Sequence, residues 1–209
     1  MTTVSAPSGQ STVAVVRAGP NEAAHLFHTL TLAFGSDPPT RWLFPTAEQH
    51  VRCFARFAQA LGGAAFGRRT AYSTEGGTGV ALWLPPDAHA DEAALVDLVK
   101  TDVAPRERAD AFAVFEEMAR YHPAEPHWYL PLIGVDPAWQ GRGLGAALLK
   151  ATLTQFDAMG AAAYLESTNP RNRPLYERHG FAVVCEIRVG SCPPITPMLR
   201  HPQRVGRQC

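Results

Sequence analysis

The feature of this sequence that most constrains its fold is an apolar segment followed by a glycine-rich turn. The segment from Trp128 to Val135 has almost no polar position, which is typical of a central strand covered on both faces. We expect the strand to end at Asp136-Pro137. The turn Gln140-Gly-Arg-Gly-Leu-Gly145 then leads into apolar residues at helical spacing. A strand, a turn and a buried helix in this order predict an α/β fold.

The same turn is a candidate anion site. The first amide groups of a helix have no partner within the helix, and the positive end of the helix dipole attracts a phosphate. Gly141, Gly143 and Gly145 allow close approach to the backbone, and Arg142 adds a positive charge. The turn therefore predicts phosphate binding, with a tight loop that binds no ligand as the alternative.

A dinucleotide-binding fingerprint is a second alternative for this region. Gly141, Gly143 and Ala146 satisfy the pattern G-x-G-x-x-A, and Glu166 follows at about the distance of the acidic residue in that motif, roughly 20 residues. However, the glycines of that motif follow the strand directly, whereas Asp136-Pro-Ala-Trp139 intervenes here. We therefore reject the dinucleotide-binding interpretation.

The rest of the chain predicts alternating strands and helices in one domain. Residues 12–200 are expected to form that domain, with a flexible N-terminus at 1–11 and a tail at 201–209. We expect Pro38-Pro39 to end the first helix and Trp42, Leu43 and Phe44 to form a turn. Further strands are predicted at 12–17, 68–74, 79–84, 162–166, 181–189 and 196–199, and helices at 21–34, 47–61, 91–100, 105–121 and 174–178.

Composition limits the classes of partner. The 19 Lys and Arg balance the 19 Asp and Glu, so charge gives no reason to expect nucleic acid or an anionic membrane. No signal peptide or membrane-spanning stretch is evident, which predicts a cytoplasmic location. The four cysteines form no CxxC pair, so no metal site is proposed.

Two motifs resemble those of one family. The stretch from Val135 to Ala146 resembles the pyrophosphate-binding motif of GNAT acetyltransferases, Gln/Arg-x-x-Gly-x-Gly/Ala, which Gln140, Gly143 and Gly145 fill. The stretch Asn169-Pro-Arg-Asn-Arg-Pro-Leu-Tyr-Glu-Arg-His-Gly-Phe181 resembles the second signature of that family. Ala33-Phe34 followed by Pro39-Thr40-Arg41, and the Glu125-Pro126 pair, are similar to puromycin N-acetyltransferases.

The resemblance implies a fold and an activity. The fold is α/β (α+β), with a central mixed, mostly antiparallel sheet of six to seven strands, flanked by helices and splayed at the central strand pair. The activity is acetyl-CoA-dependent transfer to the primary amine of a small molecule, with an antibiotic-like amine as one option. Transfer would be direct, in a ternary complex without a metal, by a monomer or homodimer. The alternatives are a protein or peptide N-acetyltransferase and a non-catalytic acyl-CoA sensor.

The resemblance also assigns residues to roles. Tyr176 matches the tyrosine that protonates the CoA thiolate, because a phenol with a pKa near 10 can donate to a thiolate whose parent thiol has a pKa near 8.5. Glu125, Glu166 and His127 are candidate bases for the acceptor amine. The acceptor is expected to contact Phe34, Asp37, Trp42, Trp83 and His127. Acetyl-CoA is expected to contact Ile133, Gly134, Val135, Gln140, Gly141, Arg142, Gly143, Leu144, Gly145, Ala146, Asn169, Asn172 and Tyr176.

Overall fold

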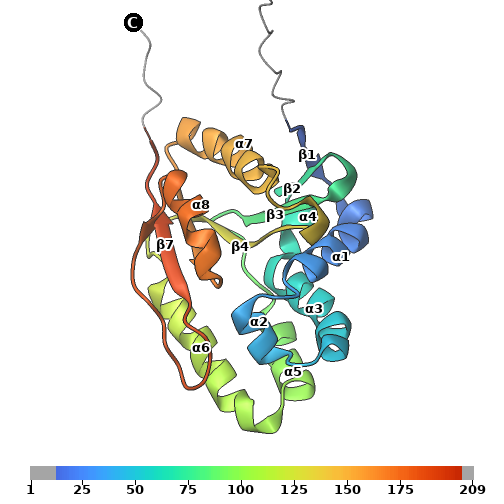
Figure 1. Ribbon diagram of the computed structural model, residues 1–209. Coiled ribbons are helices and arrows are strands. Elements are labelled where there is room, and N and C mark those ends of the chain that lie inside the picture. Colours follow the sequence, from blue (N-terminus) through green and yellow to red (C-terminus); the bar gives the residue numbers. More distant parts are fainter. Residues whose placement is uncertain (1–12, 204–209) are drawn as a thin grey trace, which may run out of the picture.

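A twisted sheet of seven strands forms the centre of the computed structural model, which describes residues 13–203 (Figure 1). The strand order is β1-β2-β3-β4-β5-β7-β6. Neighbouring strands are antiparallel except β4 and β5, which are parallel. The strands are β1 Val15–Ala18, β2 Ala71–Thr74, β3 Gly79–Leu84, β4 His127–Val135, β5 Ala162–Ser167, β6 Ala182–Val183 and β7 Thr196–Arg200. The predicted mixed, mostly antiparallel sheet is confirmed.

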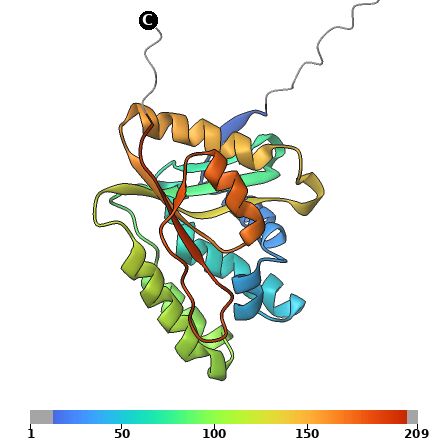
Figure 2. The same cartoon turned by 60° about the vertical axis from the view of Figure 1, so that its left-hand side comes forward.

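Helices cover both faces of the sheet (Figures 1 and 2). Helices α7 (Leu144–Ala158) and α8 (Arg173–Arg178) lie on one face, and α1 (Ala23–Ala33), α3 (Ala47–Gly62) and α4 (Ala64–Gly67) lie on the other. Helix α5 (Glu92–Asp102) packs along α3, and α6 (Arg108–Tyr121) packs against α5. The short elements are α2 Pro38–Leu43, η1 Pro20–Glu22, η2 Glu75–Gly77, η3 Pro105–Glu107, η4 Pro137–Trp139 and η5 Pro170–Asn172.

The central strands separate at the predicted place. Strands β4 and β5 pair only from His127 to Tyr129, opposite Ala162 to Tyr164. Strand β4 continues to Val135 and β5 to Ser167 without further pairing between them. The two strands therefore leave a gap between their backbones beyond Tyr129.

Gly134 in β4 has a packing role that the sequence did not reveal. A Cβ atom at this position would lie 2.7 Å from Ala33 Cβ and 3.1 Å from Leu30 Cδ2. Since both neighbours belong to α1, the glycine lets this helix lie directly against β4. The sequence predicts that acetyl-CoA contacts Gly134, and within the chain the group that approaches it closely is helix α1.

Trp83 is a correction to the predicted acceptor site. Its side chain is fully buried in β3, and its ring meets Phe156 of α7 edge-on at 4.8 Å. Trp128 stacks on the same phenylalanine at 4.4 Å. Trp83 is therefore part of the core beneath α7 and not part of an acceptor surface.

Two local predictions were wrong because of proline and capping. Trp42 and Leu43 belong to helix α2 instead of a turn, since Pro38 and Pro39 suit the first helical turn and Asp37 accepts a hydrogen bond from Thr40 N at 3.1 Å. The expected strand at 181–189 reduces to β6 and one bridge between Ile187 and Ile195. The neighbouring segment contains Pro193, Pro194 and Pro197, which have no N–H to extend the ladder. The helix predicted at 21–34 is present as η1 followed by α1, which begins at Ala23.

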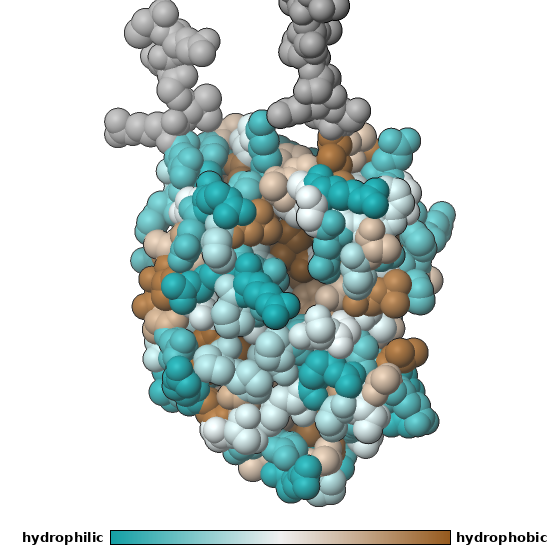
Figure 3. Space-filling view, viewed as in Figure 1, coloured by the Kyte–Doolittle hydropathy of each residue, from teal (hydrophilic) through white to brown (hydrophobic). Residues whose placement is uncertain are grey.

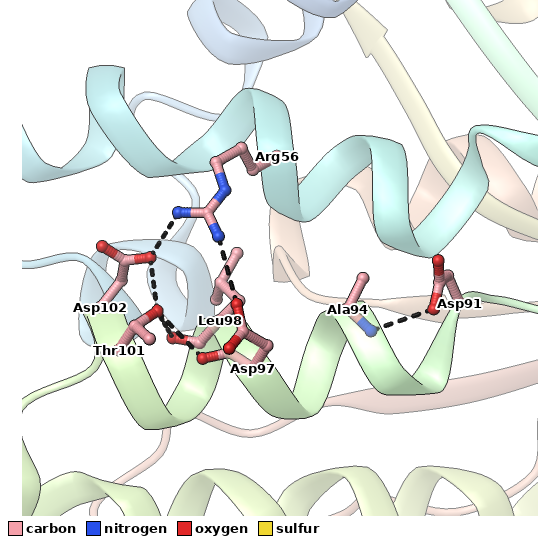
Figure 4. A network of polar contacts seen from close by, with 7 residues as sticks. All are labelled: Arg56, Asp91, Ala94, Asp97, Leu98, Thr101 and Asp102. Carbon is pink, nitrogen blue, oxygen red and sulfur yellow. Dashed lines mark hydrogen bonds and ion pairs between the residues drawn. The ribbon is translucent and has the colours of Figure 1, made fainter.

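A polar network links α3 to α5 at the surface (Figure 4). Arg56 lies 2.9 Å from a carboxylate oxygen of Asp102 and 3.5 Å from one of Asp97. Asp91 caps α5 by accepting a hydrogen bond from Ala94 N at 3.0 Å. Because Arg56 and Asp97 are more than half exposed, this pair contributes little to stability.

Candidate active site

The glycine-rich turn joins the end of β4 to the start of α7. Gly141 and Gly143 have φ angles of 75° and 79°, a left-handed conformation that side-chain-bearing residues adopt at a cost. The first hydrogen bond at the start of α7 joins Ala147 N to Gly143 O. The amides of Leu144, Gly145 and Ala146 are consequently in the position where a helix start binds an anion.

Two polar residues of the turn differ in what they contact. Gln140 donates from Nε2 to the carbonyl of Val135 at 3.1 Å and thereby holds the turn to the end of β4. The guanidinium of Arg142 lies 4.6 Å from the ring centroid of Trp139. Arg142 is exposed and forms no ion pair in the described part of the chain, so its charge remains available to an anion at the turn.

Replacing Gly143 with Ala is expected to weaken acetyl-CoA binding about tenfold, because the alanine disfavours the left-handed φ that aims the amides. Gly160→Ala is the matched control. Gly160 lies just beyond the other end of α7, also has a positive φ of 65°, and likewise has open space where a Cβ would be. Both variants should lose about 1 kcal/mol of stability, but only Gly143→Ala should raise the dissociation constant measured by calorimetry. Equal affinities for the two variants would contradict the assignment of the turn.

Two cavities lie on the opposite side of the strand gap from α7. The inner cavity, of about 70 Å³, is lined by Pro131 and Leu132 of β4 and by Glu166 and Thr168 at the end of β5. It thus opens onto both edges of the gap. The molecular surface shows an apolar hollow over β4, between α8 and α1 (Figure 3).

The outer cavity is larger, at about 800 Å³, and lies between the α5–α6 pair and the start of β4. Both cavities are lined by Leu61, Phe115, Met118 and Tyr129, so they adjoin each other along these residues. In the described part of the chain, no Lys or Arg lines either cavity. The carboxylate that lines the inner cavity is Glu166, and those that line the outer cavity are Glu92, Glu116 and Glu125.

The structure distributes the predicted acceptor residues unevenly. Phe34 and Trp42 line the inner cavity, and His127 and Glu125 line the outer one. Asp37 lines neither. It is buried and accepts hydrogen bonds from Thr40 and from Thr168 Oγ1, so it joins α2 to the loop after β5.

Glu166 is the centre of a titratable cluster that the sequence showed only in part. Its side chain is 3% exposed, and its Oε1 lies 3.2 Å from Nε2 of His122. This contact lacks hydrogen-bond geometry, and Oε1 makes no hydrogen bond within residues 13–203. Burial and the nearby Glu166 carboxylate raise the pKa of both Tyr129 and Tyr164.

The histidines of the cluster come from the α6–β4 connection. The His122 ring lies 4.6 Å from each of the rings of Tyr129 and Tyr164, and 5.5 Å from that of His127. Burial lowers the pKa of His127, whose Nδ1 donates to the carbonyl of Glu125 at 2.9 Å. Sequence reasoning missed His122, because it follows α6 in a loop and belongs to no recognisable spacing pattern.

The residues of the second motif lie beyond the other edge of the gap. Tyr176 of α8 is 5% exposed, and burial together with the charge of Asp37 raises its pKa. Asn169 caps η5 by accepting a hydrogen bond from Arg171 N at 3.1 Å. Asn172 is exposed and provides no side-chain cap to α8, so its amide is free for a ligand, whereas that of Asn169 is engaged.

Two general properties of the described residues bear on function. Within residues 13–203, no group of three or more His, Cys, Asp or Glu side chains is arranged to hold a metal ion. Over the same range, none of the helices has the length and apolar character needed to cross a membrane.

Comparison with known proteins identifies the fold and the motif region. Residues 89–181 match the model of the acetyltransferase (GNAT) family. An uncharacterized N-acetyltransferase of Schizosaccharomyces pombe is 35% identical over 79 residues, which cover 36% of this chain and 32% of that protein. A mycothiol acetyltransferase of Propionibacterium freudenreichii is 40% identical over 86 residues, which cover 40% of this chain and 26% of that protein. The chain therefore matches only about a third or less of the length of these relatives.

Solved structures are similar over most of the chain. A structure from Corynebacterium glutamicum, described as histone acetyltransferase HPA2 and related acetyltransferase, has a TM-score of 0.64 at 25% identity and covers 92% of this chain and 97% of its own. Arylalkylamine N-acetyltransferase 2 from Aedes aegypti has a TM-score of 0.64 at 12% identity, with 91% and 99% covered. With the strand gap and the glycine-rich turn, these similarities show that the chain has the fold of the GNAT acetyltransferases and that its residues 89–181 match that family.

Proposed function

We propose that this protein transfers the acetyl group of acetyl-CoA directly to the primary amine of a small molecule. One observation carries this proposal. Residues of both strands that border the gap, β4 and β5, line the inner cavity, and the glycine-rich turn lies at the end of β4. A thioester arm lying along β4 from the turn would therefore reach the wall of a cavity that an amine can occupy. The unpaired edge of β4 would bind the amides of this arm as an added strand does.

The residues around the gap can supply each proton transfer. The acceptor ammonium gives a proton to the Glu166 carboxylate, and the neutral nitrogen attacks the thioester carbonyl. Main-chain N–H groups of β4 between Leu132 and Gly134 that face the gap stabilise the oxyanion. The carbon–sulfur bond then breaks, the leaving thiolate takes a proton from Tyr176, and the second proton of the attacking nitrogen passes through water to the resulting tyrosinate. We favour Glu166 over Glu125 as the base because Glu166 lines the inner cavity, whereas Glu125 is exposed at the outer one.

The form of the cavities favours a small acceptor over a protein. The inner cavity is small and surrounded by apolar residues, so a folded polypeptide cannot enter it and only a long, thin side chain could reach the gap. The proposed location in the cytoplasm, a monomer or homodimer, and the similarity to puromycin N-acetyltransferases remain predictions from the sequence.

The test is acetyl-CoA binding by calorimetry, followed by thiol release with a panel of amines. The panel includes puromycin, an aminoglycoside, simple alkylamines and a lysine-containing peptide. Binding together with thiol release on a small amine is the expected result. Release only with the peptide would favour the protein acetyltransferase, and binding without release would favour the acyl-CoA sensor. No binding at millimolar acetyl-CoA would overturn the proposal.

A further inference from the structure

We infer that the acceptor is a primary amine with one cationic nitrogen on an extended apolar body. Its nitrogen lies at Glu166 in the inner cavity, and its body extends into the outer cavity. This inference rests on the proposed function and makes it more specific. It follows from the continuity of the two cavities, the state of one buried carboxylate, and the absence, among the described residues, of a second carboxylate lining the inner cavity.

The continuity of the cavities sets the shape of the acceptor. Leu61, Phe115, Met118 and Tyr129 line both cavities, and all four present apolar surface. A ligand whose nitrogen reaches the strand gap must pass these side chains. The part of the ligand beyond them meets further apolar groups of the outer cavity, such as Leu95 and Phe112. An acceptor with an extended apolar body can make these contacts along the whole path, whereas a compact polar acceptor cannot.

The Glu166 carboxylate sets the charge of the acceptor. Its side chain is almost fully buried, yet Oε1 makes no hydrogen bond within the described residues. The buried hydroxyl of Tyr164 is also without a hydrogen-bond partner there, but this residue lines neither cavity. Unpaired buried polar groups are costly, and a primary ammonium in the inner cavity can donate a hydrogen bond to the Glu166 carboxylate. His122, which lines the outer cavity, lies 3.2 Å from the same oxygen without forming a hydrogen bond to it.

The remaining charges argue against a second cationic group or a polyol. Glu92, Glu116 and Glu125 are exposed at the outer cavity, so water and salt weaken their interaction with a bound cation. They attract a cation from a distance but give it no buried partner. The sugar hydroxyls of an amino sugar would meet mainly apolar side chains, which offer them no hydrogen bonds.

A series of straight-chain alkylamines tests the inference with the unaltered protein. From butylamine to octylamine, kcat/KM should rise about threefold to fourfold with each methylene group, because each one leaves water for an apolar surface. Spermidine, an aminoglycoside and a lysine-containing peptide should each be poorer acceptors than octylamine. The assay is thiol release at saturating acetyl-CoA.

A pair of lysine substitutions on α6 provides a matched test of location. Ala119 is exposed and lines the outer cavity, whereas Ala109 is exposed on the same helix and lines neither cavity. Ala119→Lys should lower kcat/KM for octylamine about fivefold through repulsion of the cation and obstruction of its body. Ala109→Lys should leave it unchanged, and the KM for acetyl-CoA should be unaltered in both variants.

The outcomes separate the inference from the function on which it rests. If no amine releases thiol, the proposed function fails. If amines release thiol but kcat/KM is flat or falls with chain length, the function stands and the apolar acceptor is wrong. A preference for spermidine, the aminoglycoside or the peptide also overturns the inference, as do equal losses in the two lysine variants.

Discussion

Replacement of Tyr176 with Phe is expected to lower kcat at least a hundredfold while leaving the affinity for acetyl-CoA within about twofold. The substitution removes only the phenolic hydroxyl from a residue that is 5% exposed, so the packing of α8 against Phe181 should persist. Loss of a positioned general acid typically reduces rate by a factor of 10² to 10⁴. Thiol release and calorimetry measure the two quantities separately.

The pH dependence of the unaltered protein is a second test of the same assignment. Burial and the Asp37 charge raise the pKa of Tyr176, so the phenol stays protonated up to and beyond its ordinary pKa of about 10. The rate should therefore not fall through loss of this acid between pH 7 and 9.

Tyr72→Phe is the matched control for Tyr176→Phe. Tyr72 is also buried, and its hydroxyl lies 3.4 Å from Gln155 Oε1 on the β2 side of α7. This control should retain full turnover. An unchanged kcat in Tyr176→Phe would show that another group or a water protonates the thiolate.

Asp157→Asn is expected to reduce the free energy of unfolding by about 3 to 5 kcal/mol, which is typical when one partner of a buried ion pair is removed. Both carboxylate oxygens of Asp157 lie 2.7 Å from guanidinium nitrogens of Arg200, and Arg200 is 3% exposed. Arg200 Nε also donates to the carbonyl of His179 at 2.8 Å. The substitution leaves this guanidinium buried without a counter-charge, where α7 meets β7.

Asp97→Asn serves as the control, since Asp97 also contacts an arginine, Arg56, but at the exposed surface shown in Figure 4. Its effect should be below about 1 kcal/mol. Urea unfolding at pH 7 measures both variants. Similar losses for the two would contradict the importance of burial.

The stabilisation from Asp157 should depend on pH in a defined direction. Its hydrogen bonds to Arg200 hold the pKa of its carboxyl below the ordinary value, which is about 3.9. The stabilisation is therefore present above that ordinary value and is lost as the pH falls through the lowered pKa. The stability difference between the unaltered protein and Asp157→Asn should shrink at pH values below about 4.

The sequence predicted the local backbone of the glycine-rich turn and the helix that carries Tyr176. Gly141 and Gly143 have the left-handed conformation that glycine favours, and Tyr176 lies within the second motif on the short helix α8. The acceptor side was predicted less well. His122 was missed, Asp37 proved to be a helix cap, and Trp83 proved to be core.

The sequence by itself determined the local elements of this protein. The apolar run of β4, the glycine-rich turn and the helical spacing of α7 each depend on residues that are close together in the sequence. Their patterns can therefore be recognised from the sequence alone. Proline and glycine likewise set the ends of helices and the breaks in strands through their own backbone restrictions.

Only the tertiary structure decided which residues meet. Every residue of β3 is buried, so no alternation of polar and apolar positions could show that Trp83 faces α7. Gly134 is required by α1, a helix distant in sequence. The cluster of Glu166, His122 and Tyr164 joins β5 to the loop before β4, because parallel pairing sets Tyr164 opposite Tyr129 and the His122 ring lies against both tyrosines. Such contacts depend on the packing of distant segments, and no local pattern records them.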